Sequence, residues 1–225
     1  MCVKRLGMIT IGQAPRPDVA PMIETYLAGR AELVQAGVLD GLSAQEVAER
    51  LSPGDGEYVL TSRMASGEAA VMSREKIQPI LQEKIRGMEQ SGIQTILLLC
   101  TGVFPGLAAE KAFLIEPDQV IPPTLAAMTK GKRLGVLLPL EEQKETLKEK
   151  YHQHELFPVF AAASPYEEDE GSFRAACAEL KEQADIVILD CMGYTEKARE
   201  IVSALTGLPV ILSNAMMAKL VSEMI

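Results

Sequence analysis

Histidine is scarce in this sequence, and basic residues do not outnumber acidic ones. The two histidines among the 225 residues are His152 and His154, so catalysis that pairs a serine or cysteine with histidine has little to build on. Two neighbouring histidines make no closed metal site, and we expect no bound metal. Lysine and arginine number 22 against 31 acidic residues, and this charge balance disfavours nucleic acid and anionic membranes as partners.

Long apolar runs and targeting patterns are also missing. No stretch approaches the roughly 18 apolar residues that span a bilayer, and the start of the chain lacks a secretory pattern. Neither glycine-rich nucleotide-binding motif occurs, so we expect no cofactor. The four cysteines show no metal-ligand or Cys-x-x-Cys spacing, which is typical of reduced thiols. Together these absences predict a cytoplasmic protein without a membrane partner.

Two apolar runs in the chain end in a similar way. Residues 186–189 are Ile-Val-Ile-Leu and are followed by Asp190, Cys191 and then Gly193. The run at 96–99 leads to Cys100 and then Gly102 in the same manner. A buried parallel strand is such an apolar run, and a glycine beyond it lets the chain turn. We therefore expect two strands that each present a cysteine at the carboxyl end.

Strand and helix patterns alternate along the rest of the chain. This alternation is typical of an α/β protein with parallel sheets covered on both faces. Asp18, Ser43 and Ser73 stand where helix N-caps are expected, and Ser43 begins a capping-box pattern. The predicted strands are 5–12, 32–37, 96–99, 112–117, 133–138, 157–161, 186–189 and 209–212, with one or two short strands within 57–71. The predicted helices are 19–28, 43–51, 73–91, short ones near 117 and 124, 141–151, 172–183, 195–205 and 214–224.

A short internal sequence repeat predicts two related halves. Residues 5–10, Arg-Leu-Gly-Met-Ile-Thr, match residues 133–138, Arg-Leu-Gly-Val-Leu-Leu, and each half contains a helix, a strand and a Cys-x-Gly unit. We expect one lobe from residues 1–110 plus 211–225 and a second lobe from 111–210. Parallel sheets bind ligands at the carboxyl ends of their strands. Two facing halves therefore place the two cysteines on opposite sides of one cleft.

Two thiols across a cleft suit carbon-acid chemistry. One thiolate removes a proton alpha to a carboxylate, and the opposite thiol delivers one to the other face without a cofactor. Backbone N–H groups at the following turns lower a thiol pKa and bind a carboxylate. The alternative interpretation of Cys100 and Cys191 is that each is a small buried hydrophobic residue that packs at a strand end. Cys177 is predicted to be packing inside a helix, and Cys2 receives no role.

Other polar side chains fall where a cleft is expected. Asp190 opposes a thiolate at Cys191 if the two charges meet, and orienting the site or acting as the base are its alternatives. Gln13 and Arg16 follow the first strand. We expect Arg16 either to bind a substrate carboxylate or to be a solvated loop residue. Arg63 is a weaker candidate for the same role. Asn214 follows the last strand, and a helix-capping role there is the competing interpretation.

Three segments resemble the AroM family, and the resemblance covers essentially the whole chain. They are residues 9–18 (Ile-Thr-Ile-Gly-Gln-Ala-Pro-Arg-Pro-Asp), 189–194 (Leu-Asp-Cys-Met-Gly-Tyr) and 212–214 (Leu-Ser-Asn). At longer range the architecture is similar to the aspartate/glutamate racemase superfamily, including hydantoin racemases, maleate isomerases and arylmalonate decarboxylases. This resemblance implies two pseudo-symmetric α/β halves with a catalytic residue, usually cysteine, from each. Cys100 and Cys191 fall on those positions.

The sequence departs from the racemase pattern beside both cysteines. Cys100-Thr101-Gly102 replaces Cys-Asn-Thr, and Cys191-Met192-Gly193 replaces a Cys-Thr pattern. These changes weaken the case for amino-acid racemisation more than the case for the fold. Our first hypothesis is a cofactor-independent racemase, isomerase or lyase acting on a small carboxylate, with Cys100 and Cys191 as acid and base. The second is a non-catalytic metabolite-binding or regulatory protein that reuses the cleft and is linked to aromatic amino-acid biosynthesis.

The expected partner is a small carboxylate-containing metabolite, and a homodimer is a further expectation. The residues expected to bind the substrate lie in the loops after the strands. They are Gln13, Arg16, Thr101, Gly102, Asp190, Met192, Gly193, Tyr194 and Asn214.

Overall fold

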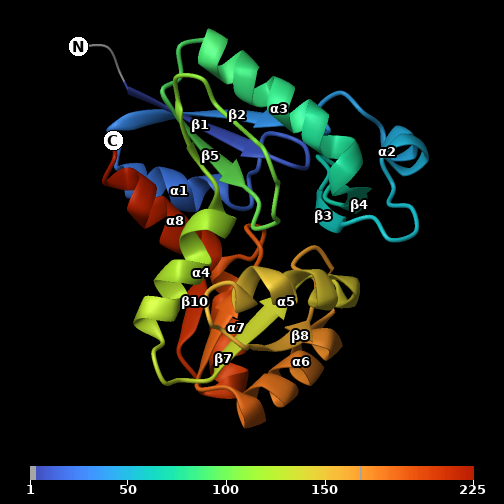
Figure 1. The fold of residues 1–225 in the computed structure, drawn as a ribbon, viewed down its shortest axis with the longest axis vertical. Coiled ribbons are helices and arrows are strands. Elements are labelled where there is room, and N and C mark those ends of the chain that lie inside the picture. Colours follow the sequence, from blue (N-terminus) through green and yellow to red (C-terminus); the bar gives the residue numbers. More distant parts are fainter. Residues whose placement is uncertain (1–3, 168) are drawn as a thin grey trace.

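The structure, a computed structural model, describes residues 4–167 and 169–225 and contains two parallel sheets stacked along the long axis (Figure 1). The first sheet has the order β2-β1-β5-β6. Its strands are β1 (Lys4–Thr10), β2 (Ala31–Gly37), β5 (Thr95–Leu99) and β6 (Phe113–Ile115). All its pairings are parallel, so the carboxyl ends of its strands lie along one edge.

The second sheet repeats this order. Its strands are β7 (Leu134–Leu138), β8 (Val159–Ala162), β9 (Ile186–Leu189) and β10 (Val210–Leu212), all parallel. The order β10-β9-β7-β8, taken from its other end, matches β2-β1-β5-β6 strand for strand. In each half the first strand of the sheet pairs with the strand that follows it and with the strand that leads to a cysteine. The expected α/β fold with two pseudo-symmetric halves is confirmed.

The strand register shows that the two similar sequence segments, 5–10 and 133–138, occupy equivalent positions in the two sheets. Gly7 of β1 pairs with Ile96, and Gly135 of β7 pairs with Val187. The cysteine after β5 and the cysteine after β9 each lie four residues beyond those partners. The two cysteines therefore occupy equivalent positions at the carboxyl edges of the two sheets.

Helices cover both sheets. Ser43 and Glu46 form the expected capping box, and the side chains of Ser73 and Thr195 cap α3 and α7. The predicted cap at Asp18 is wrong, because Val19 occupies that position and Asp18 pairs with an arginine instead. The helices are α1 (Ala20–Leu27), α2 (Ala44–Arg50), α3 (Arg74–Gln90), α4 (Pro117–Met128), α5 (Lys144–His152), α6 (Glu170–Gln183), α7 (Glu196–Thr206) and α8 (Ser213–Ser222), with a 3-10 turn η1 (Glu141–Gln143) before α5.

The first half carries an insertion that has no counterpart among the described residues of the second half. Strands β3 (Val59–Arg63) and β4 (Ala69–Ser73) form an antiparallel hairpin between α2 and α3, as the pattern within 57–71 predicted. The two short helices predicted near 117 and 124 are one helix, α4, which begins at Pro117 and contains two further prolines. The hairpin lies on the side of the first half that faces the second half, where β3 contacts η1 (Figure 1).

The chain crosses between the sheets at points that differ from the expected lobe boundaries. Strand β6 lies beyond residue 110 but belongs to the first sheet, and β10 reaches residue 212 but belongs to the second. Helix α8 then packs against α1 of the first half and beside α4. The division into 1–110 plus 211–225 and 111–210 therefore differs from the division of the sheets by a few residues.

One apolar core joins the two halves. Buried side chains of β1 and β5, such as Leu6 and Leu97, belong to the same cluster as Val136 of β7 and Met217 of α8. Because burial of apolar area stabilises at about 25 cal/mol per Å², this shared core resists separation of the halves. No helix in the described ranges is long and apolar enough to cross a membrane.

Helix packing over Gly135 leads to a first prediction. A Cβ atom on Gly135 would lie 3.0 Å from both the Ala184 Cβ and a Leu180 Cδ2 of the covering helix segment, closer than side chains normally pack. We expect Gly135→Ala to lower the free energy of unfolding by about 1–3 kcal/mol, the usual cost of overpacking. Gly87→Ala is the control, since Gly87 is an exposed position of α3 with nothing near its Cβ, and a gain of about 0.5–1 kcal/mol is expected. Urea unfolding measures both, and equal effects would contradict the packing argument.

Candidate active site

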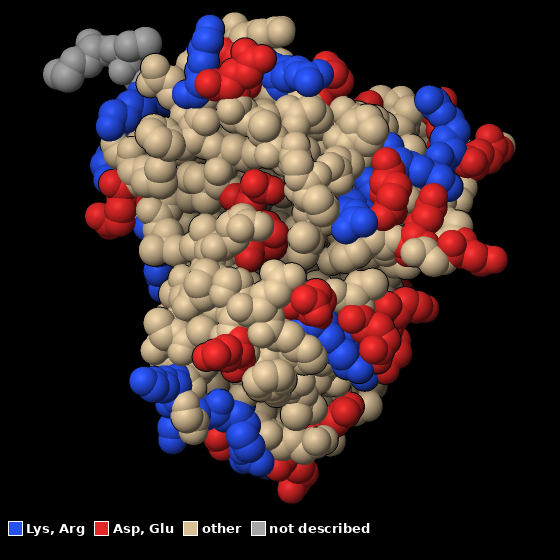
Figure 2. Space-filling model, in the orientation of Figure 1, with Lys and Arg blue, Asp and Glu red and all other residues tan. Residues whose placement is uncertain are grey.

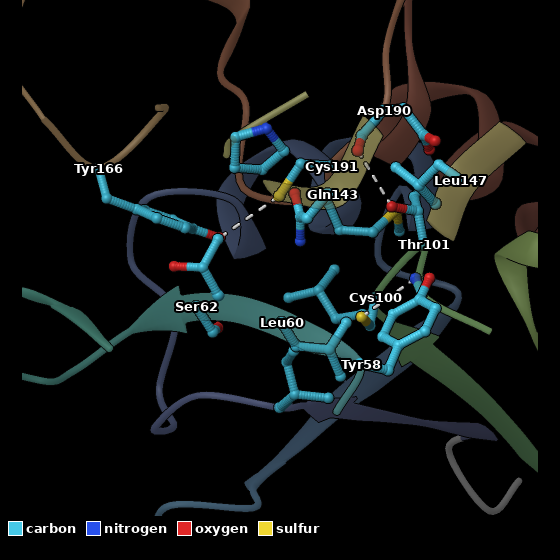
Figure 3. Close-up of a pocket in the computed structure, with 16 residues that line it drawn as sticks. Tyr58, Leu60, Ser62, Cys100, Thr101, Gln143, Leu147, Tyr166, Asp190 and Cys191 are labelled. Carbon is cyan, nitrogen blue, oxygen red and sulfur yellow. Dashed lines mark hydrogen bonds between the residues drawn. The ribbon is translucent and has the colours of Figure 1, made fainter. Parts of the chain in front are cut away.

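The loops after β5 and β9 face one cavity between the two halves (Figure 3). Its volume is about 20 Å³, which is room for about one water molecule. Most of its wall is apolar, with a few hydroxyl and amide groups. The lining residues are Ile11, Tyr58, Leu60, Thr61, Ser62, Leu99, Cys100, Thr101, Gly102, Pro139, Gln143, Leu147, Tyr166, Asp190, Cys191 and Met192.

Cys100 and Cys191 both line this cavity, one from each half, with 8% and 9% of their surface exposed. The Gly102 N–H donates to the Cys100 Sγ at 3.3 Å, and the Gly193 N–H donates to the Cys191 Sγ at 3.4 Å. The two Cys-x-Gly units thus make the same local contact.

Close neighbours leave no free space for a side chain at either glycine. A Cβ on Gly102 would lie 2.6 Å from a Leu60 methyl carbon, and a Cβ on Gly193 would lie 2.2 Å from the Tyr166 hydroxyl oxygen. A larger residue at Gly193 would therefore displace Tyr166, whose hydroxyl lies 3.5 Å from the Cys191 Sγ. Sequence reasoning missed Tyr166, which lies in the loop after β8, because no local pattern marks that loop.

Burial controls the ionisation of the two thiols. It raises the pKa of Cys100 to about 12, although the Gly102 N–H and Lys150 act in the opposite direction. Burial also raises the pKa of Cys191, against the lowering effects of the Tyr166 hydroxyl, the Gly193 N–H and Arg16. The backbone N–H groups therefore act as expected, but in this closed arrangement desolvation outweighs them and both thiols are neutral.

Asp190 is held by a buried ion pair. The Lys150 ammonium lies 2.8 and 3.1 Å from its two carboxylate oxygens, and the Tyr151 hydroxyl donates to it at 2.9 Å. Lys150 also donates to the Thr101 carbonyl at 2.9 Å, and the Thr101 hydroxyl donates to the Asp190 carbonyl at 3.1 Å. Both charged side chains are almost fully buried. This network joins the loop after Cys100 to the loop before Cys191.

Lys150 and Tyr151 were missed because they lie on a charged segment that looked remote from the cysteines. A signal was available in the helical spacing. Leu147 is buried, and residues three and four positions later share its helix face. That spacing places Lys150 and Tyr151 toward the protein interior, where a buried lysine needs an acidic partner.

Arg16 is buried, so its interpretation as a solvated loop residue is wrong. Its guanidinium makes two hydrogen bonds to Asp18, at 2.9 and 2.7 Å, and donates to the Thr10 hydroxyl at 3.0 Å. It also lies 5.9 Å from the centre of the Tyr166 ring. Arg16 thus supports the side chain that contacts Cys191. Arg63 is more exposed and lies 3.8 Å from the same aspartate.

Three other residues that were expected to bind the substrate donate hydrogen bonds to backbone carbonyls instead. The Gln13 amide donates to the carbonyls of Leu39 and Leu42, and the Tyr194 hydroxyl donates to a carbonyl at residue 163. Asn214 donates to the carbonyls of residues 192 and 194 and does not cap α8, so the capping interpretation is wrong. These contacts hold the loops that carry the cavity, and direct contact of these residues with a substrate stays a prediction.

The remaining thiol and histidines lie elsewhere. Cys177 is buried in α6, as the packing interpretation predicted, and Cys2 lies outside the described residues. The His152 ring packs against Phe157, and His154 lines a separate cavity. Within residues 4–167 and 169–225, no three His, Cys, Asp or Glu side chains are grouped to hold a metal ion.

The chain belongs to the AroM family, because the family profile described as AroM protein matches residues 6–225. Solved structures with the same fold include an aspartate racemase from Picrophilus torridus, at 12% identity and a TM-score of 0.63 over 98% of this chain and 94% of that one. A maleate isomerase from Pseudomonas putida S16 is similar at 14% identity and a TM-score of 0.60, over 97% and 93% of the two chains. An allantoin racemase from Klebsiella pneumoniae reaches 16% identity and a TM-score of 0.61, over 98% and 87%. No sequence among the curated proteins is a significant match. The fold is therefore that of the Asp/Glu racemases.

The buried ion pair generates a second prediction. Lys150→Met leaves Asp190 as a buried charge with one hydroxyl donor, and we expect a loss of about 3–5 kcal/mol in the free energy of unfolding. Lys148→Met, two residues away and exposed, is the matched control and should change stability by less than about 0.5 kcal/mol. Adding Asp190→Asn to Lys150→Met should recover part of the loss. Thermal and urea unfolding measure all three, and equal stability of the two lysine variants would contradict the network.

A third prediction concerns thiol reactivity. Because burial raises both thiol pKa values, the thiolate fraction is small at neutral pH and alkylation by iodoacetamide should accelerate up to at least pH 9. Tyr166→Phe removes a donor that lowers the pKa of Cys191, so alkylation of Cys191 should slow several-fold while that of Cys100 serves as the internal control. Mass spectrometry of the labelled peptides gives both rates. A rate that is already constant below pH 7 would show a low-pKa thiolate and contradict this prediction.

Proposed function

We propose that this protein is a racemase, isomerase or related lyase that acts on a small carboxylic acid without a cofactor. The observation that carries the proposal is the pair of thiols. Cys100 and Cys191 follow equivalent strands of two related sheets, line one cavity and receive the same glycine N–H hydrogen bond. Two such groups on opposite sides of a carbon atom can exchange its proton.

The surroundings of the thiols suggest which one acts first as the base. Cys191 has the Tyr166 hydroxyl, the Gly193 N–H and the Arg16 charge to stabilise its thiolate. In the proposed reaction the Cys191 thiolate takes the proton alpha to the carboxylate, and the electron pair of the broken C–H bond moves into the carboxylate as an enediolate. The Cys100 thiol then gives its proton to the opposite face and becomes the thiolate. The reverse direction exchanges these roles.

The cavity wall favours an apolar acid over an amino acid. Asp190 is the one charged residue among the lining residues; Lys150 already neutralises its charge and the Tyr151 hydroxyl donates a hydrogen bond to it. A substrate ammonium group would therefore find no free carboxylate there. Leu60, Leu147 and the other apolar side chains suit an alkyl or aryl substituent, and the backbone N–H groups at residues 101 and 192 are the proposed donors to the substrate carboxylate.

Substrate entry requires the halves to separate locally. A volume of about 20 Å³ is too small for a carboxylic acid of several non-hydrogen atoms. Three hydrogen bonds between the halves close the site: Lys150 to the Thr101 carbonyl, the Thr101 hydroxyl to the Asp190 carbonyl, and Gln143 to the carbonyl of residue 59. Opening would admit water and lower both thiol pKa values, because desolvation is the largest effect that raises them.

Deuterium exchange tests the proposal as a fourth prediction. Alkyl- and arylmalonates and 2-arylpropionates, which carry a hydrogen on the saturated carbon alpha to the carboxylate, are incubated with the protein in D₂O, and deuterium at that carbon is followed by NMR. We expect at least one acid to exchange, and Cys100→Ser and Cys191→Ser each to reduce the rate by about 100-fold or more. Cys177→Ala removes a buried thiol away from the cavity and is the matched control that should retain the rate. Exchange that survives both cavity variants would contradict the two-thiol mechanism.

The second candidate function is a non-catalytic metabolite-binding or regulatory protein. The small closed cavity and the neutral thiols favour it. In that case an acid of the same panel should raise the melting temperature of the wild type, while no deuterium appears in it. A stabilising acid that also exchanges its proton would exclude this candidate.

A further inference from the structure

A second cavity lies between the halves, on the other side of Lys150 from the thiols. Its volume is about 310 Å³, which is within the range of about 300–1,000 Å³ that small-molecule sites occupy. It is formed by the start of α3, the loop after Cys100, the first turn of α4 and one face of α5. The lining residues are Tyr58, Arg74, Val103, Asp118, Gln119, Thr146, Glu149, Lys150, Gln153 and His154.

The second cavity contains a buried acceptor without a partner. Asp118, in the first turn of α4, is 5% exposed, and its Oδ2 accepts a hydrogen bond of 2.8 Å from the Gln119 amide. Among the residues that the structure describes, none donates a hydrogen bond to its Oδ1. An unpaired buried carboxylate oxygen is costly, so this atom calls for a donor from outside the chain.

The charges around Asp118 favour a positively charged donor. Glu116 lies on the same turn, and burial together with the nearby Asp118 raises the pKa of Glu116 to about 7. Glu149 adds a third acidic residue, and the Lys150 ammonium on the same cavity is paired with Asp190. Burial raises the pKa of Asp118, while the Gln119 amide and the Lys150 charge act in the opposite direction. On the face of the molecule seen in Figure 2, several acidic side chains lie near the junction between the two halves.

A separate cation lies on another wall of the same cavity. The Arg74 guanidinium lies 4.6 Å from the centre of the Tyr58 ring and donates to the Val103 carbonyl at 3.4 Å. Its other terminal nitrogen pairs with Glu75, and Arg74 lines the cavity. An acid group and a basic group on different walls match the two charges of an amino acid.

We propose that this second cavity binds a small amino acid, with its ammonium group on Asp118 and its carboxylate toward Arg74. The thiol cavity has no free carboxylate for an ammonium group, so the two cavities select different ligands. The occupant would lie against Tyr58 and Lys150, both of which contact the thiol site. This binding does not depend on the proposed catalysis.

Matched ligand pairs on the wild-type protein test the proposal as a fifth prediction. Each of the common L-amino acids is compared with the carboxylic acid that lacks its amino group, for example phenylalanine with 3-phenylpropionate, by thermal shift and calorimetry. We expect at least one amino acid to raise the melting temperature while its deaminated partner does not compete for the same site. Equal binding of the two partners, or no binding across the panel, would overturn the proposal and leave a cavity filled by water.

Variants then locate the site. Asp118→Asn should weaken the binding of the amino acid by about tenfold or more, because a charged hydrogen bond to the ligand is lost. The variant should not lower the stability of the free protein. Glu179→Gln, at an exposed position of α6, is the matched control and should not change the affinity. Cys191→Ser should bind the amino acid as the wild type does. Loss of binding in Cys191→Ser, or full binding in Asp118→Asn, would place the ligand elsewhere and overturn the assignment.

Discussion

The ion pair between Lys150 and Asp190 is the constraint on which the arrangement of the site depends. A lysine and an aspartate that are almost fully buried are tolerated because each satisfies the other, and because Tyr151 and the Thr101 carbonyl complete their hydrogen bonding. Asp190 precedes one cysteine and Thr101 follows the other. The same pair therefore holds the two thiol loops together and separates the two cavities.

The halves repeat one framework, but the surroundings of the two thiols differ. The strand order, the glycine over which a helix packs and the Cys-x-Gly contact are shared. Tyr166 and Arg16 approach only the cysteine of the second half among the contacts described for the two thiols. A symmetric frame with asymmetric electrostatics suits a reaction in which one thiol gives up its proton more readily than the other.

Much of the fold followed from patterns in the sequence. Apolar runs that end in Cys-x-Gly predicted two parallel strands, and the echo of Arg5-Leu6-Gly7 at Arg133-Leu134-Gly135 predicted two related halves, because strand burial and close helix packing are local demands on residue type. The capping box at Ser43 was predictable for the same reason. The roles of Arg16 and Asn214 were not, because a polar residue in a loop can face solvent, ligand or backbone.

Residue type and spacing along single elements were enough to predict the parallel α/β halves and the positions of Cys100 and Cys191 at equivalent strand ends. The folded chain was needed to show that Lys150 and Tyr151 of a charged helix reach Asp190, that the Tyr166 hydroxyl contacts the Cys191 Sγ, and that both thiols are neutral in a closed cavity. Those features depend on which distant segments meet and on how much water they exclude, and neither quantity is encoded in a local pattern.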